Sequence, residues 1–418
     1  MRGQRFSIAP RWIFVILVVT LFVGIAYATI REAVLYTFSP DAPYGSAPIG
    51  GLVFDAAGNL YGTTERGGYY AQYGTVFELA RTAGGGWKER TLHSFNPNIH
   101  RGGANPQASL IFDAVGNLYG TTTSGGAYGY GTAFELTANG HGGWSEITLH
   151  SFNKDGNDGY WPACNLIFDA AGNLYGTTTS GGTYDSGMVF ELTPDRDGGW
   201  TEVVLHDFNH GTDGSYPQAG LTFDAAGNLY GTTVNGGTYG YGTVFALNPE
   251  AGGGWAETVL HSFNKNGTDG INPYAGLILD AAGNLFGTTI YGGSSYFCGT
   301  VFGLSPKAGG GWREGVLHSF TNNQKDGCQP YAGLISDGAG NLYGTTSVGG
   351  TQDCGTVFAF KPKAGQGSEE KVFYSFLNDF QDGCLPTDSV TMDALGNLYG
   401  TTASGGMGLA GTVFGVKP

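Results

Sequence analysis

Apolar residues occur in short runs that alternate with turn-forming residues along almost the entire chain. In one representative stretch the runs cover residues 165–168, 174–178, 188–192 and 200–208, and a tight turn over 169–172 separates the first two. An apolar spacing of 3.6 residues, which would indicate a helix, is absent from these runs. The pattern therefore predicts four short antiparallel strands, named A, B, C and D here, joined by turns and loops.

This four-strand unit repeats seven times. The motif Asp-x-x-Gly-Asn-Leu-(Tyr/Phe)-Gly-Thr-Thr marks each copy at the turn between strands A and B. Four hairpin-linked strands in a repeat of this length are typical of a β-propeller blade. The first residues of the seven motifs are Asp55, Asp113, Asp169, Asp224, Asp280, Asp337 and Asp393.

The two ends of the chain carry the strands that would close such a repeat into a ring. Residues 33–38 match strand D, whereas residues 413–416 match strand C and are not followed by a strand D. A ring that joins these segments leaves no exposed sheet edge. We therefore predict an all-β fold: a single seven-bladed β-propeller over residues 29–418, with four antiparallel strands per blade and an N-terminal strand that closes the ring.

The repeated motif, together with the Gly-Gly and Gly-Thr-Val-Phe segments that follow it, resembles the GloVer tandem repeat of exported bacterial proteins. The resemblance extends over essentially the whole mature chain in seven copies. It implies a propeller-like fold with no established activity, and it supplies no catalytic residues. Members of that family often carry varied C-terminal sorting anchors; we expect none here, because Pro418 directly follows the last predicted strand.

Residues 1–28 have the features of an export signal. A basic segment with three arginines precedes an apolar run, and Ala26-Tyr27-Ala28 is a typical cleavage site. We predict a signal peptide, with an uncleaved membrane anchor over residues 12–28 as the alternative. Either interpretation places the mature chain outside the cytosol: secreted, periplasmic or at the cell surface.

The chain is acidic, with a formal net charge of −15 at pH 7. An acidic surface repels phosphate backbones, so we expect no nucleic-acid partner. The same charge opposes self-association, and we expect a monomer.

Four of the five cysteines occupy two repeat positions, one just before strand C and one in the loop between strands D and A. Antiparallel pairing of C and D brings these positions together. We therefore predict the disulfides Cys298–Cys328 and Cys354–Cys384, in keeping with export. Cys164 lies in a strand A and is predicted to be a buried free thiol.

The B–C and D–A loops of all blades should share one face of the ring, because the strands alternate in direction. These loops are long and rich in aromatic residues, Trp161 among them. Aromatic rings beside Asn, Asp and Gly suit sugar or peptide binding. The alternative is that the rings only fill the space under the loops.

A ligand site is expected on this face where the repeat is broken, since packing alone requires no exceptions. The breaks lie in the first B–C loop, in the following D–A loop, and at the start of the seventh strand A, where an aspartate replaces the usual alanine. The arginines there would suit an acidic sugar or a carboxylate. Drift in terminal repeats is the alternative explanation. The candidate residues are Glu65, Arg66, Tyr69, Tyr70, His100, Arg101, Trp161 and Asp388.

Metal and cofactor chemistry finds little support in the sequence. Five histidines share one position in strand D, but tyrosine takes that position in the other two blades, so we interpret them as packing residues. The segment 153–158 is similar to an oxygen-rich calcium loop but lacks its terminal glutamate, and turns capped by aspartate explain it more simply. We predict no metal site, with Ca²⁺ as the one alternative. The histidines are His93, His150, His206, His261 and His318.

Three functional hypotheses follow. The first is an exported, non-enzymatic binding scaffold whose loop-rich face holds a glycan or an extracellular protein. The second is a carbohydrate-active hydrolase or lyase with carboxylates at the mouth of the tunnel. The third is a purely structural surface protein. No Gly-x-Ser-x-Gly, His-x-x-x-His or Cys-x-x-Cys motif occurs, so serine-hydrolase and zinc-hydrolase functions have no support.

Overall fold

The computed structural model describes residues 33–41, 43–70, 72–99, 101–140, 143–363 and 366–418. The predicted signal peptide and the predicted anchor segment 12–28 lie outside the described residues. Among those described, no helix has the length and apolar character needed to cross a bilayer.

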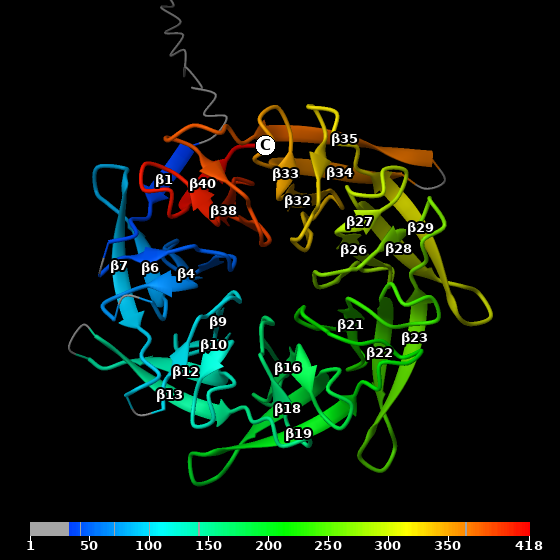
Figure 1. The fold of residues 1–418 in the computed structure, drawn as a ribbon, viewed down its shortest axis with the longest axis horizontal. Coiled ribbons are helices and arrows are strands. Elements are labelled where there is room, and N and C mark those ends of the chain that lie inside the picture. The colour runs from blue at the N-terminus through cyan, green and yellow to red at the C-terminus, as the bar shows by residue number, and fades with distance from the viewer. Residues whose placement is uncertain (1–32, 42, 71, 100, 141–142, 364–365) are drawn as a thin grey trace, which may run out of the picture.

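Seven antiparallel four-stranded sheets surround a central axis, as predicted (Figure 1). The innermost strands, A, are β3 (Val53–Phe54), β9 (Ile111–Phe112), β15 (Ile167–Phe168), β20 (Thr222–Phe223), β25 (Ile278–Leu279), β31 (Ile335–Ser336) and β37 (Thr391–Met392). The B strands are β4 (Leu60–Thr64), β10 (Leu118–Thr122), β16 (Leu174–Thr178), β21 (Leu229–Thr233), β26 (Leu285–Thr289), β32 (Leu342–Thr346) and β38 (Leu398–Thr402).

The two outer strands are longer than strand B in the first six blades and equal to it in the seventh. The C strands are β6 (Thr75–Arg81), β12 (Thr132–Ala138), β18 (Met188–Pro194), β22 (Thr243–Pro249), β28 (Thr300–Pro306), β34 (Thr356–Lys363) and β40 (Thr412–Val416). The D strands are β7 (Trp87–Ser94), β13 (Trp144–Ser151), β19 (Trp200–Asp207), β23 (Trp255–Ser262), β29 (Trp312–Ser319), β35 (Gln366–Ser375) and, for the seventh blade, β1 (Ala33–Thr37).

The ring closes as the chain ends predicted. Strand β1 pairs antiparallel with β40, with Val34 opposite Phe414, and so completes the seventh blade (Figure 1). The strand order of that blade is β1-β40-β38-β37, which joins the first described residues to the last. Both terminal edges are therefore covered.

Phenylalanine rings hold neighbouring blades together. The residue that follows each strand D places its ring edge-to-face on a strand-C ring of the next blade, with centroids 5.0–5.2 Å apart. Edge-to-face pairs of this kind add to the stabilisation from apolar burial. The pairs are Phe38–Phe77, Phe95–Phe134, Phe152–Phe190, Phe208–Phe245, Phe263–Phe302, Phe320–Phe358 and Phe376–Phe414.

Strand A is shorter than the apolar run predicts. The run over 165–168 yields only the two-residue strand β15, because the segment before it contacts the neighbouring blade instead of its own sheet. Thr121 Oγ1 of the preceding blade donates to the carbonyl of Cys164 at 3.0 Å. Equivalent threonines make this bond at all seven blade interfaces, at 2.8–3.3 Å.

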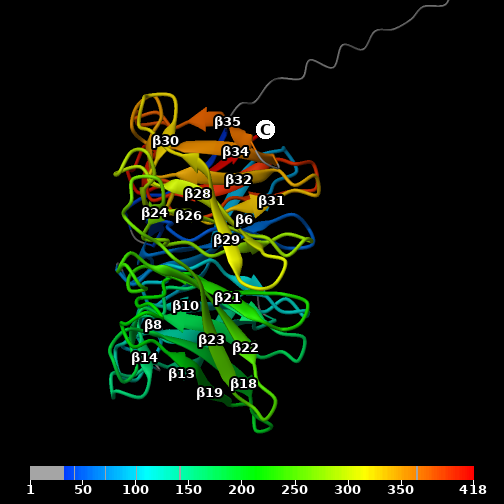
Figure 2. The same ribbon diagram turned by 90° about the vertical axis from the view of Figure 1, so that its right-hand side faces the viewer.

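The B–C and D–A loops share one face, as predicted. In six blades a two-residue strand of each loop pairs with the other, and in the fourth blade Ser215 bridges Asn235. Figure 2 shows these ribbons on one side of the disc, with the C–D hairpins extending toward the other side. The ribbons are β2 (Gly45–Ser46) with β5 (Arg66–Gly67), β8 (Gly103–Ala104) with β11 (Ser124–Gly125), β14 (Gly159–Tyr160) with β17 (Ser180–Gly181), β24 (Gly270–Ile271) with β27 (Tyr291–Gly292), β30 (Gly327–Cys328) with β33 (Val348–Gly349), and β36 (Gly383–Cys384) with β39 (Ser404–Gly405).

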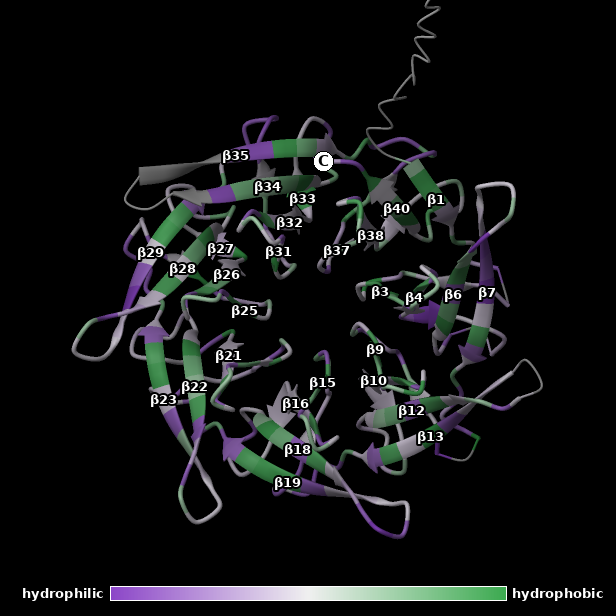
Figure 3. Ribbon diagram, turned by 180° about the vertical axis from the view of Figure 1, so that it is seen from behind, coloured by the Kyte–Doolittle hydropathy of each residue, from purple (hydrophilic) through white to green (hydrophobic). Residues whose placement is uncertain are grey.

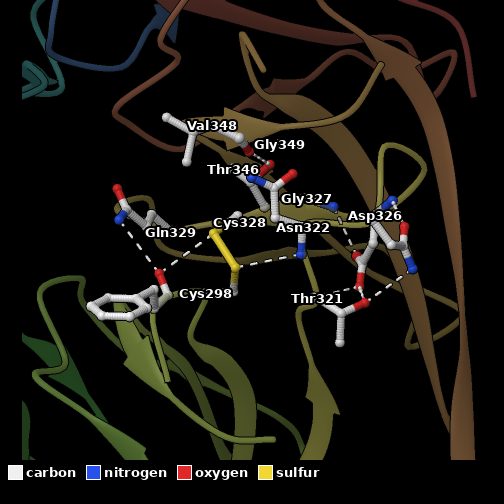
Figure 4. The surroundings of a disulfide bond; sticks show 12 residues. Cys298, Thr321, Asn322, Asp326, Gly327, Cys328, Gln329, Thr346, Val348 and Gly349 are labelled. Atoms are coloured by element: carbon white, nitrogen blue, oxygen red, sulfur yellow. Dashed lines mark hydrogen bonds between the residues drawn. A yellow bond between two sulfur atoms is a disulfide. The ribbon is translucent and has the colours of Figure 1, made fainter. Parts of the chain in front are cut away.

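Both predicted disulfides are present, and Cys164 is a buried free thiol as predicted. The Cys298–Cys328 bond ties strand β30 to the segment before β28, beside the turn that contains Asp326 (Figure 4). Two structural disulfides indicate an oxidising compartment outside the cytoplasm.

Candidate ligand-binding site at the channel mouth

A central channel of about 610 Å³ runs between the innermost strands. Its wall is made by residues of the A strands or just before them in all seven blades, and Figure 3 shows the labelled A strands nearest the centre of the ring. A volume of this size suits a small ligand. Most lining residues are apolar or glycine, so the few polar side chains in the wall define what the channel could recognise.

Asp388 is the one carboxylate in the channel wall among the described residues. Its Oδ2 accepts hydrogen bonds from the Gly51 N–H at 2.6 Å and from Ser109 Oγ at 2.9 Å, and its Oδ1 accepts from the Ser389 N–H. Burial raises the pKa of Asp388, and these hydrogen bonds oppose the increase. The carboxylate thus links the seventh, first and second blades across the closing interface.

A second pocket, of about 270 Å³, opens beside the channel on the loop-rich face. Three residues, Gln107, Ala163 and Gln218, line both spaces, so the pocket forms part of the channel mouth. Its wall carries no charged side chain among the described residues. The full lining is Gln107, Thr123, Ser124, Trp161, Ala163, Thr179 and Gln218.

Trp161 provides the aromatic surface of this pocket. Its side chain is 48% exposed and its ring meets the Tyr160 ring edge-to-face at 4.9 Å. The backbone is held in the left-handed region at φ 57°, because the Trp161 N–H donates to Tyr130 O and the Trp161 carbonyl accepts from the Thr179 N–H. The backbone that carries the exposed ring is therefore fixed by hydrogen bonds to two blades.

The same backbone conformation occurs at the equivalent position of every blade. Each of these residues precedes a proline, has φ between 54° and 61°, and donates its N–H to the preceding blade. The backbone is thus constant around the mouth whereas the side chain changes from blade to blade, which is how a ring can present different contacts to a ligand. The residues are Ala47, Asn105, Trp161, Tyr216, Asn272, Gln329 and Leu385.

Two of the candidate residues, from the first B–C loop, lie next to the mouth without lining the pocket. Glu65 Oε1 accepts a hydrogen bond from Gln107 Nε2 at 3.0 Å, and Arg66 Nε lies 3.4 Å from Glu65 Oε2. Arg66 is therefore already paired with a carboxylate, although most of its side chain is exposed. The positive charge that would attract an acidic ligand is partly offset at this point.

The other candidates lie elsewhere. Tyr69 and Tyr70 form an edge-to-face pair, and the Tyr69 N–H donates to Ser94 Oγ in the outermost strand β7. The carbonyl of Arg101 accepts from Thr148 Oγ1 in β13, also an outermost strand. His100 lies outside the described residues. The backbone of Arg101 and the channel-lining Asp388 thus belong to different parts of the ring, so the structure does not bring these two candidates together.

The loop that is similar to a calcium loop is organised by its own backbone. Asp155 Oδ1 accepts the N–H groups of Asn157 and Asp158, the pattern of a turn capped by aspartate. The Asp158 carboxylate takes part in other contacts than that of Asp155: its Oδ2 accepts from the Asn153 N–H and lies 3.1 Å from His150 Nε2.

Sequence reasoning missed the two glutamines of the mouth. Gln107 and Gln218 each follow the proline that precedes strand A, a position that the other blades fill with Ile49, Ala163, Tyr274, Tyr331 or Thr387. A comparison of the blades at this position would have found them. All five strand-D histidines pack against a phenylalanine, and three of them, His93, His150 and His318, also contact a carboxylate of the next blade, which the repeat pattern did not predict.

Comparisons with known proteins agree with the fold. The crystal structure of a "putative 6-phosphogluconolactonase" from Bacteroides uniformis is similar, with a TM-score of 0.51 and 14% identity over 83% of this chain and 88% of that chain. At this identity the likeness shows the fold alone. Among curated proteins, none matches this chain in sequence.

A family model described as the Gloeobacter/Verrucomicrobia repeat matches residues 22–225 and 196–414. The two matches together span nearly the whole ring and agree with the seven Asp-x-x-Gly-Asn-Leu motifs. The chain therefore belongs to the Gloeobacter/Verrucomicrobia (GloVer) repeat family.

Proposed function

We propose that the protein is an exported, non-enzymatic binding scaffold that holds a neutral glycan at the channel mouth. The observation that carries this proposal is the exposed Trp161 ring in an uncharged pocket with Gln107 and Gln218. Sugars present apolar C–H faces and many hydroxyl groups. An aromatic ring, side-chain amides and threonine hydroxyls are the groups that complement them.

The lining argues against phosphorylated and acidic sugars. Of the described residues that line the channel and the mouth pocket, none is Lys or Arg. A phosphate in a site without a cation would lose its hydration with no compensation. For this reason we do not extend the activity named for the Bacteroides uniformis protein to this chain.

The lining also favours binding over hydrolysis. Glycosidases use two carboxyl groups on opposite sides of the scissile bond. The described channel wall offers Asp388 alone, and that carboxylate already accepts hydrogen bonds from Gly51, Ser109 and Ser389. A protein that only binds a glycan does not need two carboxyl groups in this arrangement.

A glycan array with the mature chain, residues 29–418, tests the proposal. We expect retention on neutral glycans and no release of reducing sugar from them. Trp161→Asn should weaken binding about ten-fold or more, since it removes the stacking surface. Asn fits the backbone there, because Asn105 and Asn272 hold the same conformation at the equivalent position.

Tyr239→Ala is the matched control, since Tyr239 is also an exposed aromatic residue; it lies in the B–C loop of the fourth blade and does not line the mouth pocket. It should bind like the parent chain. Equal binding by the parent and the Trp161→Asn variant would contradict the proposed site. Release of reducing sugar that stops in Asp388→Asn would replace the proposal with the enzymatic alternative.

A further inference from the structure

The outer strands of neighbouring blades meet in clusters of one histidine and two carboxylates. In each cluster the histidine comes from a strand D, the aspartate from the loop that follows it, and the glutamate from strand D of the next blade. In three clusters among the described residues, the possible ligand atoms all lie within 4.8 Å of one another. These are His150, Asp158 and Glu202; His261, Asp269 and Glu314; and His318, Asp326 and Glu370.

The distances inside the clusters match those around a bound metal ion. His150 Nε2 lies 3.1 Å from Asp158 Oδ2 and 3.7 Å from Glu202 Oε2. In the cluster of His318 the corresponding distances are 3.3 and 3.6 Å. Ligands held about 2.0–2.1 Å from one tetrahedral ion lie about 3.3 Å from each other, so little movement would be needed.

Several carboxylate oxygens in these clusters are buried without a partner. Asp269 is 5% exposed, and its Oδ1 has no hydrogen-bond donor; the same holds for Glu314 Oε1 beside it. Asp158 Oδ1, Glu202 Oε1 and Glu370 Oε1 are in the same situation. A buried carboxylate oxygen normally has a partner, because its desolvation is costly otherwise. The unpartnered oxygens can therefore each accept a positively charged partner.

The interface between the first and second blades shows what happens without the aspartate. Gly102 occupies its place, and Glu146 is fully satisfied there. Glu146 Oε1 accepts from the Gly103 N–H at 2.8 Å, and Glu146 Oε2 lies 3.0 Å from His93 Nε2. In the clusters that contain the aspartate, a glutamate oxygen is left without a partner. Where histidine and glutamate meet without the aspartate, as at this interface, both glutamate oxygens have partners.

We propose that the three clusters are binding sites for a divalent transition-metal ion, such as Zn²⁺, between neighbouring blades. One imidazole nitrogen and two carboxylate oxygens form a donor set that suits zinc better than calcium, which prefers oxygen alone. Two carboxylates and a neutral imidazole balance the charge of the ion. Each ion would join two adjacent blades at the outer rim, on the side of the D–A loops.

The metal content of the mature chain tests this proposal. The chelator-treated chain is equilibrated with ZnCl₂, passed through gel filtration, and its zinc is counted. We expect at least three ions per chain and a higher melting temperature with Zn²⁺ than with chelator. Parallel samples with MnCl₂ and CaCl₂ establish the preference, and calcium alone raising the melting temperature would overturn the assignment.

Asp269→Gly copies the first interface and should lower the zinc count by one while the chain stays folded. His261→Gln provides a second variant that keeps a hydrogen-bonding side chain and should lower the count equally. His93→Gln is the matched control, because that interface lacks the aspartate, and its count should equal that of the parent.

Co²⁺ gives an independent spectroscopic readout. In the Co²⁺-loaded chain we expect visible absorption bands that lose about one third of their intensity in Asp269→Gly, as one of three sites is lost. A zinc count and a cobalt spectrum that are unchanged in Asp269→Gly and His261→Gln would refute the proposal. A chain that retains no zinc after gel filtration would refute it as well.

Discussion

Removal of the closing strand should destabilise the whole ring. In a chain that begins at residue 39, β1 is absent and the hydrogen-bonding edge of β40 is exposed. Phe38, which is 1% exposed and packs against Phe77 at 5.1 Å, is also lost. Loss of a buried phenylalanine costs about 3–5 kcal/mol on its own, and the lost strand pairing adds to this.

The effect can be measured as a melting temperature. For a domain of this size a loss of about 3–5 kcal/mol corresponds to a decrease of about 4–6 °C or more. Hydrogen exchange gives a local readout, because the amides of Thr412–Val416 are covered by β1 in the closed ring. The control is the chain that begins at residue 29, which keeps β1.

Two results would refute the reasoning. One is a truncated chain that melts at the same temperature as the control. The other is unchanged protection of the β40 amides, which would mean that β1 does not cover that strand in solution. A truncated chain that melts lower and exchanges faster in β40 would agree with ring closure.

Three further predictions concern stability and reactivity. Replacing Cys354 and Cys384 by serine should lower the free energy of unfolding by about 3–4 kcal/mol, since the disulfide closes a loop of 30 residues; an unchanged urea midpoint would argue against this. Burial acts to raise the pKa of Asp169, but hydrogen bonds within its turn outweigh it and lower the pKa below 3.8. Because the folded pKa lies below the unfolded one, this stabilisation is present above about pH 4 and is lost as the pH falls through the folded pKa. Urea unfolding between pH 3 and pH 5 should therefore depend less on pH in Asp169→Asn than in the parent chain, and equal slopes would contradict the assignment. Finally, burial raises the pKa of the Cys164 thiol, so it should react with a thiol reagent only after unfolding; rapid labelling of the native chain would show that it is accessible.

The features that the sequence predicted correctly depend on the blade itself. Antiparallel pairing of strands C and D places Cys298 beside Cys328, whatever the neighbouring blades do. Ring closure followed from the spare strand D at the start of the body and the missing one at the end. Local pairing and chain order suffice for such predictions.

The features that it missed depend on contacts between blades. His150 and Glu202 belong to different sheets, and the repeat alone does not say which outer residues of two sheets meet. The Glu-x-x-x-His spacing in five D strands could have suggested the clusters. The mouth pocket was missed for the same reason, because Gln107, Trp161 and Gln218 come from three blades.

Loop residues were hard to place along the radius of the ring. A D–A loop runs from the outermost strand of one blade to the innermost strand of the next. Arg101 lies at the outer end of such a loop and Trp161 near the inner end, although both were predicted to belong to one site. The distance of a loop residue from the axis depends on the hydrogen bonds that its loop makes, and these cannot be predicted from the repeat pattern.

The proposed glycan site can be tested by following Trp161 directly. Residues 29–418 contain six tryptophans; five start strand D in the C–D hairpins, and Trp161 alone lies in the mouth pocket. A titration with a neutral glycan from the array, followed by the indole N–H signals in ¹⁵N-labelled protein, should shift the Trp161 signal and leave the other five in place. Saturable glycan binding that leaves the Trp161 signal unmoved would contradict the site.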